Sequence, residues 1–485
     1  METRRSDVDS ESLAQVHTMK HRLIIVVLLS FSILPLSADE FGWLAGTART
    51  QITPTEPMWM AGYGSRDRPA EGTLHELWIR VLALQDASGR IGVVLSSDTL
   101  GIPQSIYTTT CRSLKEEFDL NPDQIMLHSS HTHTGPVLRG ALYDVYPLDG
   151  EQHRMIEEYS NLLEDRIVRT VRDALANLAP AEIFAGQGLA TFAVNRRNNS
   201  ERDIRKLRRA GSLKGPVDHA VPVLAVRTAA DKLLAVVFGY ACHNTNLSFY
   251  QWSGDYAGFA QYALEDVHQD AVAMFYMGCG ADQNPLPRRS VELARGYGLR
   301  LAAAVERVLA EPMQEIESDL RTQIEIVKLS FGKEPTRNEL ATLAAAGSTY
   351  RNRWAARLLN DVNNGKSLER TYPYPLQVWR LGQRQLWITM GGEVVVDYAL
   401  GFKQQYGHDV WVAGYCNDVM AYIPSLRVLD EDKPPRSGYE GNTSMMVYGR
   451  GAERWADDVE ELIAAGVDRM VYRLEAGTPN PSIAE

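Results

Sequence analysis

Histidines gather in one short stretch of this chain of 485 residues. Three of the eleven lie close together, at His128, His131 and His133. Neutral imidazole offers a lone pair and is the commonest side-chain metal ligand. Side chains two residues apart on an extended segment point to the same side, so His131 and His133 are expected at one site, one as ligand and one as acid or base. A hydrogen-bonded turn would explain the triplet equally well.

Four further candidates each follow an apolar run of strand length: His243, Cys279, Asp282 and Glu393. Two histidines, one carboxylate and an open position are typical of catalytic rather than structural zinc. The same donors also suit other divalent ions. Asp282 either orients a ligand or bonds its own backbone in a turn. Cys279 is either a reactive thiol or a small buried hydrophobe.

The apolar runs themselves predict the elements that position these side chains. The predicted strands are residues 91–95, 125–127, 223–226, 233–238, 272–277, 386–390 and 410–412. Apolar residues spaced three and four apart predict a helix over 156–178, ended by Pro180, and further helices over 291–309 and 337–360. Buried strands mixed with helices indicate an α/β fold, a mixed β-sheet core flanked by helices. The site is expected at the carboxyl ends of the strands.

Composition excludes several classes of protein. Hydrophobic residues make up 45% of the chain and charged residues 23%, which is ordinary for a globular protein. Lys and Arg number 50 against 61 Asp and Glu, so the chain lacks the basic footprint of a nucleic-acid binder, and we expect no nucleic-acid partner. Four widely separated cysteines do not make a disulfide framework. The phosphate-binding Gly-x-x-x-x-Gly-Lys-Ser/Thr loop is missing, which argues against ATP chemistry.

The first 38 residues are predicted to be an N-terminal extension followed by a signal peptide at 19–38. A basic start, an apolar run over 23–34 and a small residue before an acidic pair form this pattern. The run is shorter than the ~18 residues that suggest a membrane span, although an uncleaved anchor is the alternative. We expect a secreted or periplasmic protein, free or held at a membrane surface. Residues 39–477 are expected to form a single catalytic domain, and 478–485 a frayed tail.

A series of short motifs stands in order along the chain. They are Gly-Thr-Ala-Arg-Thr-Gln-Ile-Thr-Pro (46–54), Met-Ala-Gly-Tyr-Gly (60–64), Leu-His-Glu-Leu-Trp-Ile-Arg (74–80), Ser-Ser-Asp (96–98), His-Thr-His-Thr-Gly-Pro (131–136), Asn-Arg (195–196), Ser-Gly-Asp (253–255), Gly-Gly-Glu (391–393) and Tyr-Glu-Gly (439–441). In this order, together with His243, they resemble the neutral/alkaline ceramidase family. The chain ends soon after Tyr439, so the resemblance implies the family's catalytic domain only, without its C-terminal β-sandwich.

The resemblance implies one zinc ion held by two histidines, a glutamate and a tyrosine: His131, His243, Glu393 and Tyr422. General chemistry would not have selected a tyrosine ligand.

The resemblance also implies residues around the reacting bond. His133 would lie beside the metal as an acid/base group, Arg196 near the reacting carbonyl, and Tyr439 against the substrate. The family's catalytic serine position falls on Gly278, with Cys279 next to it. The nucleophile is therefore either a water activated by the metal or Cys279.

The predicted function is zinc-dependent hydrolysis of an amide bond in a lipid-like or N-acylated small molecule. Asp98, Asp255 and Asp282 are candidates to fix the imidazoles, a role that metal sites generally need. Two alternatives stay open: a secreted zinc-binding protein of the same fold without turnover, and a metallohydrolase acting on a non-lipid ester.

Overall fold

Two stacked β-sheets form the centre of the fold in the computed structural model, which describes residues 42–433 and 438–477. The described residues all fall in one compact unit. Eight strands of the larger sheet lie in the order β11-β9-β8-β6-β1-β3-β4-β5, and β13 pairs with β6. The bounds of these strands are β1 Trp43–Gln51, β3 Trp78–Gln85, β4 Ile91–Ser97, β5 Ile125–Ser129, β6 Ala179–Leu189, β8 Ala220–Thr228, β9 Leu233–Tyr240, β11 Val272–Met277 and β13 Gln314–Glu315.

The second sheet lies in the order β14-β15-β16-β18. Its strands are β14 Leu320–Ser330, β15 Thr371–Leu381, β16 Gln385–Met390 and β18 Trp411–Ala413. Three small pairs complete the strands: β2 Gly72–Thr73 with β10 Gln251–Trp252, β7 Ala193–Asn195 with β12 Gln283–Pro285, and β17 Glu393–Val394 with β19 Tyr422–Ile423.

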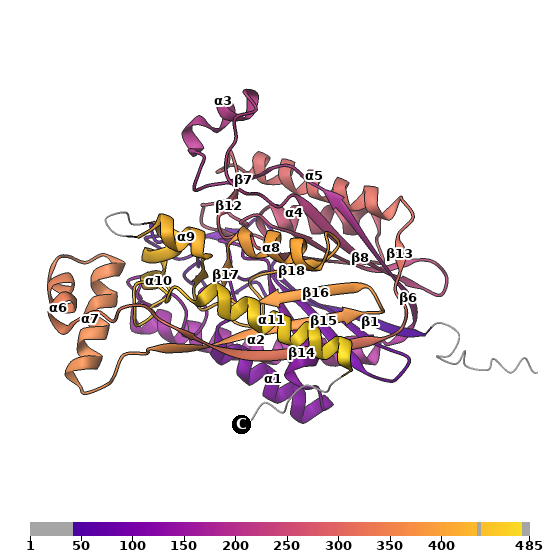
Figure 1. Cartoon of the computed structure of the whole chain (residues 1–485), viewed down its shortest axis with the longest axis horizontal. Coiled ribbons are helices and arrows are strands. Elements are labelled where there is room, and N and C mark those ends of the chain that lie inside the picture. The colour runs from indigo at the N-terminus through magenta and orange to yellow at the C-terminus, as the bar shows by residue number, and fades with distance from the viewer. Residues whose placement is uncertain (1–41, 434–437, 478–485) are drawn as a thin grey trace, which may run out of the picture. The chain divides into compact units, whose positions relative to one another are not determined.

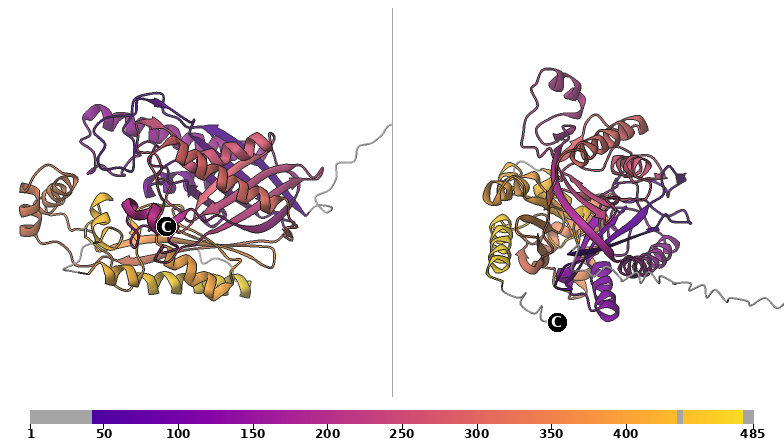
Figure 2. Two further views of the ribbon diagram at one scale, coloured as in Figure 1. Left: turned by 90° about the horizontal axis from the view of Figure 1, so that it is seen from above. Right: turned by 90° about the vertical axis from the view of Figure 1, so that its right-hand side faces the viewer.

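Helices cover the outer faces of the two sheets (Figures 1 and 2). Against the large sheet pack α2 Gly150–Ala176, α4 Asp255–Val267 and α5 Val291–Leu309, with α1 Gln104–Phe118 on α2. Helix α11 Val459–Ala476 packs on β14 and β15. The remaining helices are α3 Ile204–Arg209, α6 Arg337–Ala345, α7 Tyr350–Asn363, α8 Val396–Tyr406, α9 Leu426–Glu431 and α10 Ser444–Val447. Short turns of other helix types are η2 Pro122–Gln124, η3 Glu201–Asp203 and η4 Tyr439–Thr443.

Several strands of the large sheet, β9 and β11 among them, are apolar on both faces, because each face is buried against a different layer. Val236 and Phe238 of β9 pack in the core shared with the helices, whereas their neighbour Val237 packs between the sheets. Tryptophans of the second sheet, among them Trp379 and Trp387, fill the same space between the sheets. Continuous apolar runs are the expected pattern for strands covered on both sides. The predicted α/β class with a mixed sheet flanked by helices is confirmed, and a second sheet is added to it.

The carboxyl-terminal ends of several strands of the large sheet lie close together. His128 of β5 bridges Cys416, and Gly278, which follows β11, bridges Ala413 at the end of β18. In addition, the Ser96 hydroxyl of β4 donates to the Phe275 carbonyl of β11 at 2.5 Å. Strands that stand far apart in the sheet order therefore end beside one another, and the segments following β5, β9, β11 and β16 meet.

Every predicted strand is present, but two predicted helices differ. The helix predicted over 156–178 spans Gly150–Ala176: Asp149 caps its first turn, and Pro180 lies in β6. The helix predicted over 337–360 is two helices, α6 and α7, separated near Gly347 at φ 157°. This backbone conformation is available mainly to glycine and ends a helix.

The predicted signal peptide and tail lie outside the described residues, so the proposed domain limits stay predictions. Across residues 42–433 and 438–477, none of the helices combines the length and the apolar character that a bilayer crossing would need.

Candidate metal centre and active site

Three side chains from distant parts of the chain meet at one point. The Nε2 atoms of His131 and His243 lie 3.2 Å apart. Oε2 of Glu393 lies 3.1 Å from each of these nitrogens. All three side chains are buried, with at most 4% of any of them exposed. His131 and His243 follow β5 and β9, as expected of strand ends, and Glu393 begins β17 shortly after β16.

The protonation of the two rings makes this cluster suited to a cation. Nδ1 of His131 lies 2.7 Å from the Leu100 carbonyl, and Nδ1 of His243 lies 2.8 Å from the Gly280 carbonyl. A carbonyl only accepts, so each Nδ1 carries a proton, and in its neutral form each ring turns a lone pair at Nε2 towards the other. Burial, helped by Arg196, lowers the pKa of His243 to about 4, which keeps it neutral at pH 7.

Glu393 adds negative charge to these two lone pairs. Two facing lone pairs and a carboxylate oxygen, all within 3.2 Å of one another, repel unless a positive charge lies between them. The donor set is one that zinc prefers. The residues present therefore fit a divalent cation.

The loop that carries His131 is not extended, contrary to the expectation from the sequence. His131 has φ 56°, in the left-handed region that few residues other than glycine adopt. Such backbone strain persists only where the surroundings impose it, typically at functional sites. Here the hydroxyls of Thr132 and Thr134 both donate to the Ser253 carbonyl at 2.7 Å. His131 and His133 still converge, through a turn held by the Ser-Gly-Asp motif rather than through strand geometry.

Carboxylates were expected to fix the imidazoles, but backbone carbonyls do so. Asp98 accepts from Trp78 N and from Arg80, and Asp255 accepts from Leu247 N at 2.7 Å. Neither carboxylate contacts a ring of the cluster in the described hydrogen bonds. Their role is to hold the chain segments around the site.

His133 lies at the edge of the cluster. Its Nε2 is 3.2 Å from Nε2 of His131, and its Nδ1 has no hydrogen-bond partner among the described residues. The ring packs on Gly62, where an added Cβ would come within 2.4 Å of Nδ1, and beside the ring of Tyr63 at 4.8 Å. Burial lowers the pKa of His133 well below its usual value. A neutral imidazole with an unpaired nitrogen is placed to accept or donate a proton.

Two tyrosines hold the carboxylate side of the cluster. Tyr422 pairs with Glu393 between β19 and β17, and its hydroxyl lies 3.3 Å from Nε2 of His243. The Tyr448 hydroxyl donates to Oε1 of Glu393 at 2.5 Å. With Oε1 occupied in this way, only Oε2 of Glu393 faces the histidines.

Arg196 forms the wall next to Tyr422. Its Nη2 donates to the Tyr422 hydroxyl at 3.2 Å, and its Nε donates to Glu440 at 2.8 Å. The ring of Tyr439 lies 5.7 Å from the guanidinium carbon, and 40% of Tyr439 is exposed. The structure thus brings Arg196 and Tyr439 to the same side of the donor cluster. This side is exposed to solvent at Tyr439.

Cys279 and Gly278, the candidates at the position of the nucleophile, are buried in the core and do not line the donor cluster. Cys279 is fully buried, and its thiol lies beside the backbone of Ala399 in α8. Burial raises the pKa of this thiol well above its usual value, which disfavours the nucleophilic thiolate. At Gly278, an added Cβ would come within 3.0 Å of Ala241.

Asp282 is enclosed in the scaffold. Its carboxylate accepts from Val396 N and from Asn195, both at 2.9 Å, and its carbonyl accepts from Arg196 N at 2.8 Å. Asp282 therefore positions Arg196 rather than touching the donor cluster itself.

Known proteins are similar to this chain in sequence and in fold. Residues 43–280 match the family model described as neutral/alkaline non-lysosomal ceramidase, N-terminal. This segment of the chain belongs to the neutral/alkaline ceramidase family. Neutral ceramidase from Pseudomonas aeruginosa is 26% identical over 360 residues, which are 67% of this chain and 52% of the relative. The chain thus spans about half the length of the curated relative that it matches.

Solved ceramidase structures extend the likeness over most of the chain. The crystal structure of neutral ceramidase from Pseudomonas aeruginosa superposes with a TM-score of 0.69 at 18% identity, covering 92% of this chain and 76% of the other. A ceramidase complexed with C2 gives 0.68 at 19% identity, covering 92% and 77%. At this identity the match shows the shared ceramidase fold. His131, His133 and His243 lie in the family segment, whereas Glu393 and Tyr422 join them through the fold.

Contacts of Glu393 and of His133 were among those that the residue pattern did not predict. Tyr448, which directly follows α10, reaches Glu393 across 55 residues of chain, and no spacing in the sequence marks it. Gly62 and Tyr63 stand in the quoted Met-Ala-Gly-Tyr-Gly motif, so the motif marked the place without revealing the contact with His133. His128, by contrast, is a core residue stacked on Trp387.

Proposed function

We propose that the protein is a zinc-dependent amidase that cleaves the N-acyl bond of a ceramide-like lipid. The observation that carries the proposal is the convergence of two Nε2 lone pairs and one carboxylate oxygen within 3.2 Å. The family segment at residues 43–280 supports amide hydrolysis and a lipid substrate. When bound, zinc would polarise the carbonyl and lower the pKa of water towards ~7.

The ligands would be His131, His243, Glu393 and Tyr422. Tyr422 is the least typical, since burial raises the pKa of its phenol well above the usual value. The carbonyls of Leu100 and Gly280 keep the two imidazoles in the tautomer that turns Nε2 inward. Tyr448 holds Glu393 so that one oxygen is presented.

The chain's own residues then orient and protonate the substrate. Arg196, braced by Glu440, directs guanidinium N–H groups towards the Tyr422 side of the cluster, where the carbonyl oxygen would gain charge. His133 would take a proton from water and deliver it to the leaving nitrogen. Water is the nucleophile in this proposal, since Gly278 has no side chain and the Cys279 thiol is buried.

The test is hydrolysis of an N-acylsphingosine and of its ester analogue by zinc-loaded protein. We expect amide cleavage that disappears with a chelator and returns with zinc. Glu393→Gln should abolish cleavage, while Glu117→Gln, on the exposed surface of α1, should leave it unchanged. Cleavage of the ester alone would contradict the proposed amidase and favour a metallohydrolase of esters. Zinc binding without any cleavage would favour the alternative of a binding protein.

A further inference from the structure

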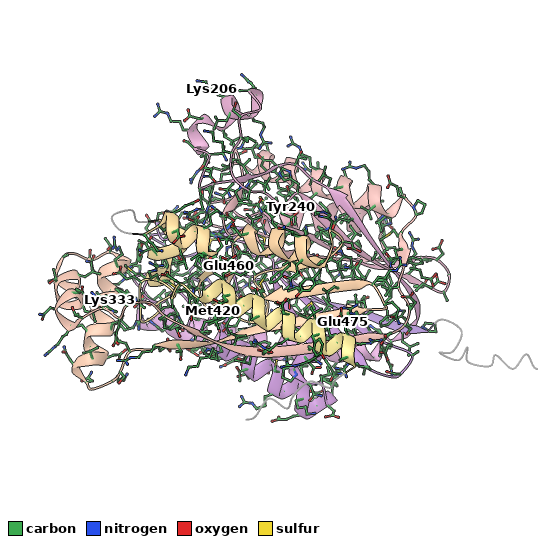
Figure 3. The ribbon with its side chains drawn as sticks, in the orientation of Figure 1. Lys206, Tyr240, Lys333, Met420, Glu460 and Glu475 are labelled. Atoms are coloured by element: carbon green, nitrogen blue, oxygen red, sulfur yellow. The ribbon has the colours of Figure 1, made fainter. Side chains whose placement is uncertain are left out.

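A strongly basic loop projects beside the site in a chain that is acidic overall. Residues 200–215, called here the basic loop, contain six basic residues and two acidic ones: Arg202, Arg205, Lys206, Arg208, Arg209 and Lys214 against Glu201 and Asp203. Across the whole chain, acidic residues outnumber basic ones by 61 to 50. Helix α3 in this loop stands away from both sheets (Figures 1 and 2), with Lys206 at its tip (Figure 3).

Most of these cations are not used within the fold. Arg208 donates to the Leu286 carbonyl at 3.0 Å and serves as an anchor. The other five basic side chains are exposed and form no ion pair with the described residues. Unpaired cations that gather on one projection create a local positive potential.

The base of the basic loop is fixed by packing and hydrogen bonds, although its tip is exposed. Ile204 is buried with Val194 and Leu286 in a small apolar cluster. Asn199 closes the loop by donating to the Lys214 carbonyl at 2.6 Å and accepting from Lys214 N at 3.0 Å. The loop therefore holds its cations at a defined place.

That place is next to the candidate active site. The loop starts directly after β7 and Arg196, and Glu201 pairs with Arg288 at 3.2 Å and Arg289 at 3.6 Å. Arg289 N in turn donates to the carbonyl of Asn246, close after His243 in sequence. The base of the loop is therefore tied to the segment that follows His243.

The chemistry of the loop suits an anionic lipid surface better than a nucleic acid. Leu213, 38% exposed, stands between the cations, and the exposed Tyr439 offers an amphipathic ring at the opening. Basic side chains beside apolar and aromatic ones are typical of segments that lie at a lipid interface. A long nucleic acid would also meet the acidic remainder of the surface, whereas a flat bilayer contacts one face of the protein only.

We propose that the basic loop docks the protein onto anionic membranes and brings the opening at Tyr439 to the lipid surface. This inference rests on the proposed function, since only a lipid substrate would need that orientation. Each Lys or Arg near an anionic bilayer contributes about 1 kcal/mol, or about fivefold in partitioning. Three of the exposed cations would therefore account for about 100-fold.

The experiment measures flotation of the full-length protein with vesicles at physiological ionic strength. Phosphatidylcholine vesicles with and without phosphatidylglycerol are compared for wild type, for Arg205→Glu/Lys206→Glu/Arg209→Glu, and for a control. The control, Lys232→Glu/Lys328→Glu/Arg384→Glu, changes the net charge equally at three exposed cations elsewhere. The apolar run at 23–34 is present in all three proteins, so only differences between them are interpreted.

We expect wild type to prefer the anionic vesicles, the basic-loop variant to bind them at least about 100-fold more weakly, and the control to stay within about fivefold of wild type. No anionic preference in wild type, or equal losses in both variants, would overturn the proposal. Wild-type binding to a single-stranded RNA but not to vesicles would also overturn it. If the glutamate variant melts early, Arg205→Gln/Lys206→Gln/Arg209→Gln replaces it, with the same expected loss.

A water-soluble short-chain N-acyl substrate, assayed without vesicles, separates docking from catalysis. All three proteins should hydrolyse it equally, because the altered residues lie outside the catalytic residues. If none of them hydrolyses it, the proposed function fails, and the vesicle comparison still decides the docking.

Discussion

Two neighbouring strand ends of the large sheet carry polar residues, yet they differ in how the protein satisfies them. His243 follows β9, and its Nε2 faces Nε2 of His131 and Oε2 of Glu393, with the Tyr422 hydroxyl 3.3 Å away. Asp282 follows the adjacent parallel strand β11, and both of its carboxylate oxygens accept hydrogen bonds from Val396 and Asn195. A place at a strand end is therefore not enough to make a site. Polar groups that face one another across a small gap indicate a bound ligand. Polar groups whose hydrogen bonds are all made within the protein indicate a structural role.

The largest expected effect is on the donor side of this comparison. His243→Ala removes one facing lone pair and should lower zinc affinity by more than about 100-fold, the upper end for partners that only support a ligand. Hydrolysis should be lost with the metal. His153→Ala, at an exposed histidine on α2, is the control and should change neither. Full zinc occupancy in His243→Ala, measured by mass spectrometry after dialysis, would end the assignment of this ligand.

Gly62→Ala tests whether His133 acts beside the metal rather than on it. The new methyl group would lie 2.4 Å from the His133 ring and displace it, so hydrolysis should fall by about 10²–10⁴-fold with zinc retained. Gly64→Ala controls for the added methyl group, since its nearest contact would be 3.7 Å away, at Val145. Because Gly62 also has φ 107°, the thermal stability of Gly62→Ala is measured beside its activity. Loss of zinc together with activity would make His133 a ligand instead.

Tyr448→Phe tests whether the hydrogen bond to Glu393 supports zinc binding. Removing the hydroxyl frees Oε1 of Glu393, and we expect zinc affinity to fall by about 10–100-fold. Tyr472→Phe, 71% exposed, should have no effect. Competition with a fluorescent chelator gives both dissociation constants, and equal values for Tyr448→Phe and wild type would contradict the role of Tyr448.

The structural role of Asp282 should appear in the pH dependence of the free energy of unfolding. Burial raises its pKa from 3.8 to about 6, so the folded protein binds more protons than the unfolded chain in this range. The free energy of unfolding should therefore fall as pH rises from about 4 to about 6, by roughly 3 kcal/mol at most.

Asp282→Asn should flatten this part of the profile, although it starts from lower stability because one acceptor is lost. Urea unfolding at several pH values measures the slope, with the exposed Asp173→Asn as control. A slope identical to that of wild type would show that Asp282 is ionised freely in the folded protein.

The smallest effect is expected at Cys279. Cys279→Ala should leave hydrolysis within about twofold and lower stability by about 1–2 kcal/mol, as small core truncations do. Its measurement is a paired assay of turnover and urea unfolding. A tenfold or greater loss of turnover in a folded, zinc-loaded variant would contradict a purely structural role and favour the Cys279 thiol as the nucleophile.

The sequence predicted seven strands correctly, because apolar runs buried on both faces are distinctive. Among the strands that it missed are β1, β3, β6, β14 and β15, in which polar residues interrupt the apolar ones. It also indicated the donors His131, His243 and Glu393 as polar residues at strand ends, while Tyr422 came only from the family resemblance. The left-handed conformation of His131 was missed, since it depends on contacts with Ser253 far along the chain. The role of the Leu100 and Gly280 carbonyls was missed for a related reason: a backbone acceptor has no residue type to recognise.

X-ray absorption at the zinc edge of the purified, zinc-loaded protein tests the central claim most directly. The account predicts one zinc per chain with only nitrogen and oxygen neighbours at about 2.0–2.1 Å, including at least two imidazoles. A sulfur neighbour at about 2.3 Å, or a folded protein that binds no zinc, would contradict it.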